Sequence, residues 1–396
     1  MSIVEIYSMK GFKQILLREF KRFFLSKDLI LICIIAPFIY SFGITYIYNK
    51  QNPRDIKIAV VNQDNSAVSR QYGRMIDSTP ELNIVDYFPS TYAAYNAIFT
   101  NQIDLFYFIP SNFSINLKRA KNTFAFIGAN ASNFMVSSSA IKTIVMTSQF
   151  LSAQVLTKFL IKNGISKNSA LQMIQPIKGN FKWMFNPTKT YANFFVPFVL
   201  LAIFQQILIV AVCHTMSLET QEKSWNNLYK ITNNKILPIL FGKAIPYVLA
   251  ALFMILLFMF FVFPFNSIFQ TSKINLLLLS LIYSFVIVFF AMCISHLFKS
   301  PVVSLCALTF YSMPVLLISG FAWPIYMLPT YLKIAAYIFP STYFINIFRF
   351  YSLNTVWIGY ATYCVINLTL FFLVCLVLNV LIFKLKIAYN KNDRLQ

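Results

Sequence analysis

Six long apolar runs without a single aspartate or glutamate are the feature that most constrains how this chain folds. A helix needs about 20 residues to cross the hydrocarbon core of a bilayer. The chain is 58% hydrophobic and 11% charged, whereas soluble domains carry about 25% charged residues. We therefore predict a membrane all-α bundle of six transmembrane helices with an inserted α+β external domain. The predicted spans are residues 29–48, 192–214, 238–264, 274–297, 302–322 and 361–383.

The distribution of basic residues predicts the orientation of these spans. Lysine and arginine gather before the first span, between the second and third, and after the last. Short loops rich in these residues stay in the cytoplasm. We therefore expect both termini, residues 1–28 and 384–396, to be cytoplasmic and the long segment 49–191 to be external. Lys243 is the one charged residue within the predicted spans, and it lies near enough to an end for its ammonium to reach the headgroups.

Residues 9–25, just before the first span, have the pattern of an amphipathic helix. The apolar side chains that share one helical face are Phe12, Leu16, Phe20, Phe23 and Phe24. Lysines and arginines lie mostly on the other faces. This pattern favours a helix in the inner membrane interface, with its basic side towards the lipid phosphates. A solvated charged helix is the weaker alternative, because the apolar stripe leads directly into a span.

The external segment alternates short apolar runs with helical patterns, which predicts a small mixed sheet with helices on it. We expect strands at 56–61, 82–85, 103–109 and 123–127, and helices at 67–77, 91–100, from 110 onwards and at 132–163. Asp64 and Ser66 offer a turn and a helix N-cap. The segment lacks a glycine-rich phosphate loop, a Ser-His-Asp set and paired carboxylates. Recognition, assembly or gating is therefore expected rather than catalysis.

Several classes of site are excluded by residue usage. The six cysteines all fall in apolar runs without a CxxC pair, and His214 and His296 form no HExxH motif. We therefore expect no catalytic, cofactor or metal site on this chain. The net charge of +21 suits anionic membrane lipid, and no motif indicates nucleic acid. The chain also lacks the phosphate loop GxxxxGK[ST], so ATP-Mg would have to bind a separate subunit.

The predicted cytoplasmic loop 215–237 holds the two acidic residues that stand alone between Asp104 and Asp393. Glu219 and Glu222 lie one helical turn apart in an otherwise basic protein. One hypothesis is a docking helix whose carboxylates meet basic or amide groups of a cytosolic partner. The other is a helix cap, with Glu219 near the positive N-terminal end of the loop helix. The spacing alone leaves both open.

Residues 323–350 are too polar and too often broken by proline to span a membrane, yet too aromatic for an ordinary loop. Pro324, Pro329 and Pro340 divide them into short helical pieces. Irregular backbone at membrane depth has to pack against protein or water. We therefore expect an external re-entrant hairpin, with an aromatic belt of no special role as the alternative.

Six motifs, in order along nearly the whole chain, resemble those of ABC-2 type exporter permeases with a large external domain between the first two spans. They are VVNQDNSAVSR (60–70), IPSNFSINL (109–117), FNPTKTYANFFVP (185–197), ETQEKSWNNL (219–228), GKAIPY (242–247) and SGFAWPIYMLPTYLKIAAYIFPSTYFINIFR (319–349). The sequence departs from the family pattern in the fourth motif. Lys223 replaces the usual glycine, Asn227 or its neighbour replaces a glutamate, and Asn233-Asn234 replace Thr-Pro.

The resemblance implies a multi-pass permease of the bacterial inner (plasma) membrane. Two such subunits, identical or paralogous, would form the membrane core above two cytosolic ABC ATPases, with a periplasmic adaptor as a further partner. Residues 1–28 would be the family's connecting helix. The positions that would couple to the ATPase are Glu219, Glu222, Ser224, Trp225 and Leu228. The external gate or hairpin would use Gly320, Phe321, Pro324, Pro329, Pro340 and Tyr343.

The spans carry no charge that would hold an ionic cargo, which favours export of an apolar or amphipathic molecule such as a lipid or a hydrophobic drug. Their polar side chains include Gln205, Gln206, Asn367 and Asn379, which would otherwise join helices to one another. A non-transporting receptor or scaffold with the same fold is the main alternative function. A membrane-embedded enzyme or an ion-coupled secondary transporter would need ionisable groups at mid-membrane, which this sequence lacks.

Overall fold

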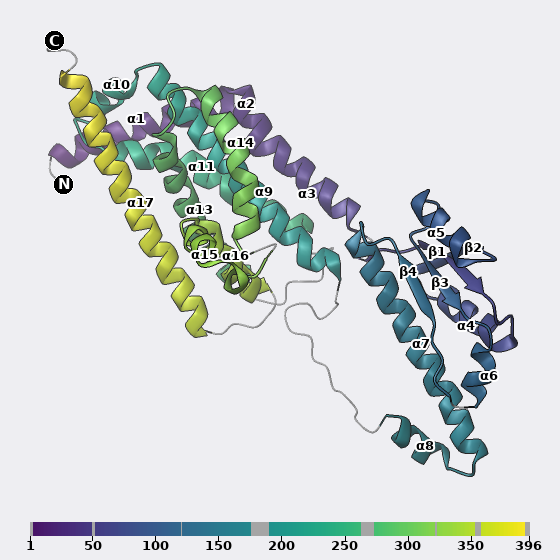
Figure 1. The fold of residues 1–396 in the computed structure, drawn as a ribbon. Coiled ribbons are helices and arrows are strands. Elements are labelled where there is room, and N and C mark those ends of the chain that lie inside the picture. Colours follow the sequence, from purple (N-terminus) through teal and green to yellow (C-terminus); the bar gives the residue numbers. More distant parts are fainter. Residues whose placement is uncertain are drawn as a thin grey trace. The chain divides into compact units, whose positions relative to one another are not determined.

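A computed structural model describes residues 3–49, 52–119, 121–175, 190–262, 273–320, 323–352 and 358–392. The chain divides into two compact units, which are coloured by sequence in Figure 1. The helical unit combines Met1–Asn49 with Trp183–Gln396, and the α+β unit is Lys50–Lys182. The sequence between the two parts of the helical unit therefore forms a folding unit of its own.

The helical unit is built from long apolar helices joined by short ones. Its helices are α1 (Ile3–Leu25), α2 (Lys27–Ile30), α3 (Ala36–Ile47), α9 (Tyr191–Gln221), α10 (Trp225–Ile231), α11 (Leu237–Leu257), α13 (Lys273–Ser295), α14 (Pro301–Ile318), α15 (Thr330–Tyr337), α16 (Pro340–Ser352) and α17 (Ile358–Asn392). A π-helical segment, Leu31–Ile35, joins α2 to α3, and a second, Phe258–Val262, extends α11. In this unit α1, α10 and the end of α17 lie at one end, and α15 and α16 lie towards the other (Figure 1).

Seven helices in the described part of the chain are long and apolar enough to cross a membrane. Six belong to the helical unit: Lys27–Ile47, Phe195–Gln221, Leu237–Val262, Ile274–Ser295, Pro301–Ile318 and Thr362–Lys386. These six overlap the six predicted spans. The seventh, Phe134–Lys162, is helix α7 of the α+β unit, where it packs on a sheet, and it was predicted as a helix of the inserted domain. The multi-pass character expected from the sequence is therefore present in the structure.

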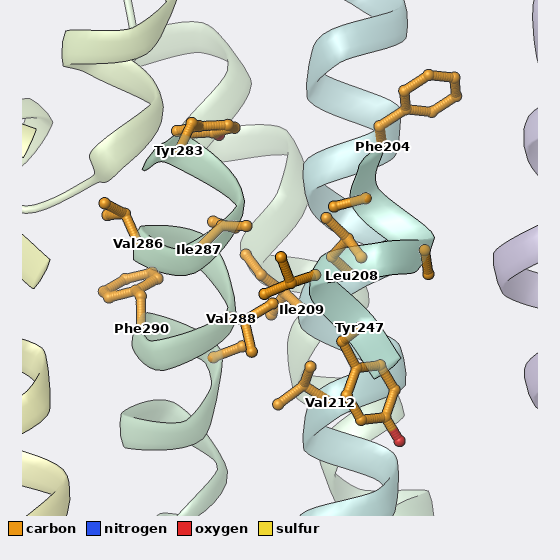
Figure 2. Close-up of a cluster of buried hydrophobic side chains, with 14 of the residues drawn as sticks. Phe204, Leu208, Ile209, Val212, Tyr247, Tyr283, Val286, Ile287, Val288 and Phe290 are labelled. Carbon is orange, nitrogen blue, oxygen red and sulfur yellow. The ribbon is translucent and has the colours of Figure 1, made fainter. Parts of the chain in front are cut away.

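The core of the helical unit forms where α9 packs against α13, with α11 alongside. Figure 2 shows Leu208, Ile209 and Val212 of α9 beside Ile287 and Val288 of α13, with Tyr247 of α11 close to Val212. Phe204 of α9 and Val286 and Phe290 of α13 belong to the same core. All these side chains are buried. The three helices are consequently apolar on several faces rather than amphipathic, which is expected of helices at the centre of a membrane bundle.

The α+β unit has a four-stranded sheet in the order β2-β1-β3-β4. Its strands are β1 (Ile56–Asn62), β2 (Leu82–Tyr87), β3 (Leu105–Ile109) and β4 (Phe126–Ala129). Strand β1 pairs in parallel with β2 and β3, and β4 runs antiparallel to β3. Its helices are α4 (Ala67–Asp77), α5 (Thr91–Phe99), α6 (Phe113–Lys118), α7 (Phe134–Lys162) and α8 (Lys167–Ile174). The sequence predicted every one of these elements except α8.

Side chains alternate across the sheet and separate two small cores. Leu105, Tyr107 and Ile109 of β3 face a layer formed by α4, α6 and α7. Phe106, the intervening residue, packs with Ala94 and Ala97 of α5 on the opposite face. As predicted, Ser66 caps α4, because its hydroxyl accepts a hydrogen bond from the Ser69 amide. The carboxylate of Asp64 also accepts from the Ser114 amide at 3.1 Å, which ties this turn to α6.

Candidate functional site

The predicted loop 215–237 is not one amphipathic helix. Helix α9 continues through Gln221, about two turns beyond the predicted end of the span, and α10 begins at Trp225 after a sharp turn. Lys223 makes this turn in the left-handed region, with φ of 51°. The resemblance places the family's glycine at this position, and glycine adopts this conformation without the steric cost that a side chain brings.

Glu219 therefore lies in the last turn of α9, where its carboxylate is the centre of a charged cluster. Oε1 accepts from the Arg18 guanidinium at 2.7 Å, from that of Arg22 at 2.6 Å and from the Lys243 ammonium at 2.9 Å. Oε2 accepts from a second Arg18 nitrogen at 3.1 Å and from the Ser224 hydroxyl. One carboxylate thus joins α1, the end of α9, the turn before α10 and α11.

Glu19 and Glu222 complete the cluster and balance its charge. The Lys243 ammonium also donates to Glu19 at 2.9 Å, and Arg18 contacts the same Glu19 oxygen at 2.9 Å. At the rim, a nitrogen of Arg22 lies 3.4 Å from a Glu222 oxygen. Three acidic side chains therefore face three basic ones. We name these six residues, Arg18, Glu19, Arg22, Glu219, Glu222 and Lys243, the ion cluster.

Burial of the ion cluster has a desolvation cost, because its charged groups are removed from water. Glu219, Glu19 and Lys243 are all almost completely buried, whereas the Glu222 side chain is 51% exposed. Burial alone would lower the pKa of Arg18, but the hydrogen bond and charge of Glu219 raise that pKa above its ordinary value. Removing a charge from water costs several kcal/mol, and this cost is offset only when opposite charges and hydrogen bonds surround it. Every buried charge of the cluster has such partners.

Trp225 and Leu228 anchor α10 against the rest of this site. Both side chains are buried, and the Lys243 ammonium lies 5.6 Å from the centre of the Trp225 ring. The indole nitrogen donates to the Thr220 hydroxyl at 3.0 Å, and the ring meets that of Phe383 edge to face at 4.9 Å. Helix α10 is thus fixed to the end of α9, to α11 and to α17 by the same aromatic side chain.

Two glycines allow α1 to approach its neighbours closely. A Cβ on Gly11 would lie 2.7 Å from the carbonyl oxygen of Ile231, at the end of α10. A Cβ on Gly242 would lie 2.8 Å from Cγ2 of Ile15, which is itself buried. Both distances are shorter than side-chain carbons tolerate. Gly11, Ile15, Glu19 and Phe23 form the buried face of α1, one position away from the predicted apolar stripe, most of which stays partly exposed.

Three sequence-based interpretations are corrected by this arrangement. The Glu219 carboxylate is bonded inside the chain, so it is not free to meet a partner directly. It also lies at the C-terminal end of α9, so the cap at a helix N-terminus is wrong. Lys243 does not extend to the headgroups, because it is buried between Glu19 and Glu219. Sequence reasoning missed Arg18, Arg22 and Glu19 as partners; the available signal was a lysine inside a span that needed a countercharge.

The predicted hairpin residues lie at the starts of short helical pieces. Pro324 precedes a single 3-10 turn, Ile325–Met327, Pro329 precedes α15 and Pro340 begins α16. Gly320 has φ of 87° and packs closely against Ile325. The Tyr343 hydroxyl donates to the carbonyl of Tyr337 at 3.2 Å, linking α16 to α15. Phe321 lies outside the described residues, and the gating role of this segment stays a prediction.

The polar residues of the predicted spans mostly join helices. The Gln206 amide donates to the Leu308 carbonyl at 2.7 Å, from α9 to α14, and Gln205 accepts from the Tyr283 hydroxyl of α13. Asn379 of α17 donates to the Phe289 carbonyl of α13 at 2.9 Å. Asn367 donates to the Tyr363 carbonyl of its own helix. Three of the four residues considered as cargo contacts are therefore engaged in packing the bundle.

Comparison with known proteins decides the family. Residues 27–381 match the sequence profile of the ABC-2 family transporter proteins. The chain belongs to this family. A search of curated proteins finds no match. The resemblance is thus confirmed at the level of the family: the chain is an ABC-2 type permease, a class of membrane subunit that is generally not catalytic itself and typically works with an ATPase partner.

The described part of this ABC-2 permease contains neither a candidate metal site nor a disulfide. It contains no group of three or more His, Cys, Asp or Glu residues that could hold a metal ion. The six cysteines, each of which lies in a described segment, form no disulfide with one another. Charged side chains of the helical unit instead gather at the junction of α1, α9, α10 and α11.

Proposed function

We propose that this ABC-2 permease is the membrane subunit of an ATP-driven exporter, and that a cytosolic ABC ATPase docks on α10 and the turn before it. The observation that carries the proposal is the ion cluster, which joins this turn to α1 and α11 through the Glu219 carboxylate. A force applied to α10 would reach two other helices through short, charge-assisted hydrogen bonds.

The exposed residues around α10 supply a surface for the ATPase. Glu222, Lys223, Asn227 and Lys230 are all exposed on the turn and on one side of α10, while Trp225 and Leu228 face inwards. In this proposal Glu219 acts as a positioning residue, because it holds the turn without touching the ATPase. Glu222, half exposed and bonded weakly to Arg22, is the carboxylate that meets the partner.

The proposed orientation rests on the number of crossings. In this proposal each of the six membrane-length helices of the helical unit crosses the membrane once, and this even number puts α1 and the end of α17 on the same side. We place this side, with α10, in the cytoplasm, because it carries most of the short basic segments. The α+β unit, inserted after the first crossing, is then external. We further propose that two subunits form the membrane core in a bacterial inner membrane.

The proposed cargo is apolar or amphipathic. The predicted span segments of α9, α11, α13 and α14 hold one charged side chain, Lys243, and Glu219, two positions from the end of α9, neutralises it within the ion cluster. A cargo with a strong negative charge would find no unpaired basic side chain in these span segments. Export of such an acidic molecule in preference to an apolar one would contradict this part of the proposal.

Co-purification tests the docking surface. The full chain is expressed with its ATPase, purified in detergent and compared with the variant Glu222→Lys, whose reversed charge should greatly reduce the bound ATPase. Asp86→Lys is the matched control, because Asp86 is an exposed acid of the α+β unit, and it should retain the ATPase. A permease that stays intact and never retains an ATPase would instead favour a receptor or scaffold with the same fold.

A further inference from the structure

The α+β unit contains a cavity of about 560 Å³ between the sheet and its helices. It is lined by β3, β4, α4, α6, α7 and α8, all of which belong to this unit. Ligand-binding pockets for small molecules commonly have volumes of about 300–1,000 Å³. The cavity is therefore large enough for one chain-like molecule, and nothing in the permease function assigned to the helical unit uses it.

The deep wall of the cavity carries a hydroxyl that lacks a well-formed hydrogen bond. Tyr107, in the middle of β3, is almost completely buried, and its hydroxyl has no such partner among the described residues. The neighbouring ring of Tyr72 meets it edge to face at 5.0 Å, and the Tyr72 hydroxyl is bonded to Ser148. Burial, and then Tyr72, raise the pKa of Tyr107, so this hydroxyl stays protonated and can donate.

A buried hydroxyl without a well-formed hydrogen bond is unusual, because native proteins satisfy the great majority of such groups. The strand alternation that directs Leu105 and Ile109 into the helical layer also directs Tyr107 there. A phenylalanine would satisfy the same packing without burying a poorly bonded hydroxyl. The position of the hydroxyl on a cavity wall therefore indicates that its acceptor is supplied from the cavity.

The rest of the lining defines the chemistry of the occupant. Most of it is apolar, including Phe113, Leu117, Ile127 and Leu156. None of the described residues that line the cavity is charged, and the polar ones carry hydroxyl or amide groups. Val145 and Leu156 of α7 are also partly exposed, so the approach to the cavity is apolar. A charged headgroup would find no countercharge here, whereas an acyl chain would find apolar contacts along its length.

We propose that this cavity binds a neutral amphipathic molecule, with its acyl chain along α7 and a carbonyl or hydroxyl oxygen accepting from Tyr107. This site is separate from the ion cluster and from the proposed ATPase surface. It does not depend on the chain being an exporter, because binding can be measured without ATP or an ATPase.

Photolabelling of the full chain in phospholipid nanodiscs tests the site. The probe is a long-chain monoacylglycerol that carries a diazirine in its chain and an alkyne for detection. After irradiation, labelled peptides are mapped by mass spectrometry. We expect saturable labelling on peptides of β3, α6 and α7 that unlabelled monoacylglycerol displaces. Labelling confined to the membrane helices would overturn the proposal.

Two variants of one helix separate occupancy of the cavity from general membrane labelling. Ser152 and Ser138 are both exposed residues of α7 whose hydroxyls donate to the carbonyl of a residue in the preceding turn, but only Ser152 is among the residues that line the cavity. Ser152→Trp should abolish labelling of β3 and α6, and Ser138→Trp should leave it unchanged. Equal labelling in both variants would contradict the assignment.

Tyr107→Phe tests the role assigned to the hydroxyl. The variant removes a buried hydroxyl without a well-formed hydrogen bond, so the empty protein should be as stable as the wild type or more stable. The concentration of probe for half-maximal labelling should rise roughly threefold to tenfold, the effect of losing one hydrogen bond. Unchanged labelling would overturn the hydrogen bond, and stronger competition by a long-chain fatty acid carboxylate would overturn the preference for a neutral molecule.

Discussion

The Lys243 ammonium lies 2.9 Å from Oε1 of Glu219, and both side chains are almost completely buried. The two residues are 24 positions apart, on α11 and α9, and Arg18 and Arg22 of α1 reach the same carboxylate. This pair is the meeting point of three helices that are remote in the sequence. Each buried charge compensates the desolvation cost of the other. Removing both should therefore cost less stability than the two separate removals added together.

Lys243→Met should destabilise the helical unit by about 3–5 kcal/mol, because it leaves buried carboxylates without their ammonium partner. Glu219→Gln should destabilise the helical unit to a comparable extent, because it leaves the partly buried arginine groups without their carboxylate partner. The double variant should be less destabilised than the sum of the two, by about 0.5–3 kcal/mol. Unfolding in detergent measures all three, with Lys230→Met at an exposed site as a control expected to stay within about 0.5 kcal/mol. Simple additivity would contradict a coupled cluster.

Lys223→Gly should stabilise the protein by up to about 1 kcal/mol. Lys223 occupies the left-handed region with φ of 51°, which costs a residue with a side chain roughly 1–2 kcal/mol and glycine almost nothing. Part of this gain is lost to the greater freedom of glycine in the unfolded chain. Asn227→Gly, in the middle of α10, should instead destabilise by roughly 0.3–0.5 kcal/mol, because glycine is a poorer helix former than asparagine. Thermal unfolding measures the melting temperature of both variants. Equal changes of the same sign would argue against the left-handed conformation of Lys223.

Gly11→Ala should separate α1 from α10. Its Cβ would lie 2.7 Å from the backbone oxygen of Ile231, and a backbone carbonyl cannot turn aside as a side chain can. We expect a loss of about 1–3 kcal/mol, typical of overpacking. Gly43→Ala, which meets nothing within 4 Å in the middle of α3, should be neutral or stabilise by about 0.5–1 kcal/mol. The same unfolding assay compares the two variants. A loss of stability in Gly11→Ala alone indicates close packing, whereas similar changes in both indicate an effect of helix propensity.

The stability of the α+β unit should depend on pH through Asp64. Burial alone would raise the pKa of Asp64, but hydrogen bonds from Ser66 and Ser114 lower it below its ordinary value of 3.8. A carboxyl with a lowered pKa in the folded state stabilises fully above its ordinary pKa, and this contribution is lost as the pH falls through the lowered value. Hydrogen exchange at α6, corrected for the intrinsic effect of pH, should therefore accelerate in acid.

Asp64→Asn is the control for this effect. The amide cannot ionise, so the variant should show less protection of α6 at neutral pH and little further change in acid. An identical pH profile in both proteins would show that another group controls the docking of α6. The Ser114 hydroxyl, which donates to the same oxygen at 3.1 Å, offers a second test through Ser114→Ala.

The helices and strands of both units were largely predictable from the sequence, because the spacing and length of apolar runs depend directly on which residues are buried. The spans follow from apolar length, and the strands at 56–61 and 103–109 follow from β-branched and aromatic runs. The end of α9 was not predictable in this way. Its last two turns are polar, and they stay helical where the charges of Glu219 are bonded to residues of other helices.

The partners of Glu219 show why the site itself could not be derived from local patterns. Arg18 and Arg22 precede it by about 200 positions, and α1 reaches the carboxylate through close packing at Gly11 and Gly242. Three-dimensional proximity of this kind leaves no periodic signal. The unpaired lysine in a predicted span was the one local indication, since a buried ammonium requires a carboxylate.

Cross-linking from α10 tests the proposed docking of the ATPase most directly. In a background without reactive cysteine, Asn227→Cys on α10 is compared with Tyr331→Cys, a 71% exposed position of α15. A bifunctional reagent added to the co-purified complex should join Asn227→Cys to a nucleotide-binding chain and leave Tyr331→Cys unlinked to it. Cross-links from Tyr331→Cys but not from Asn227→Cys would contradict the account and place the ATPase at the opposite end of the bundle.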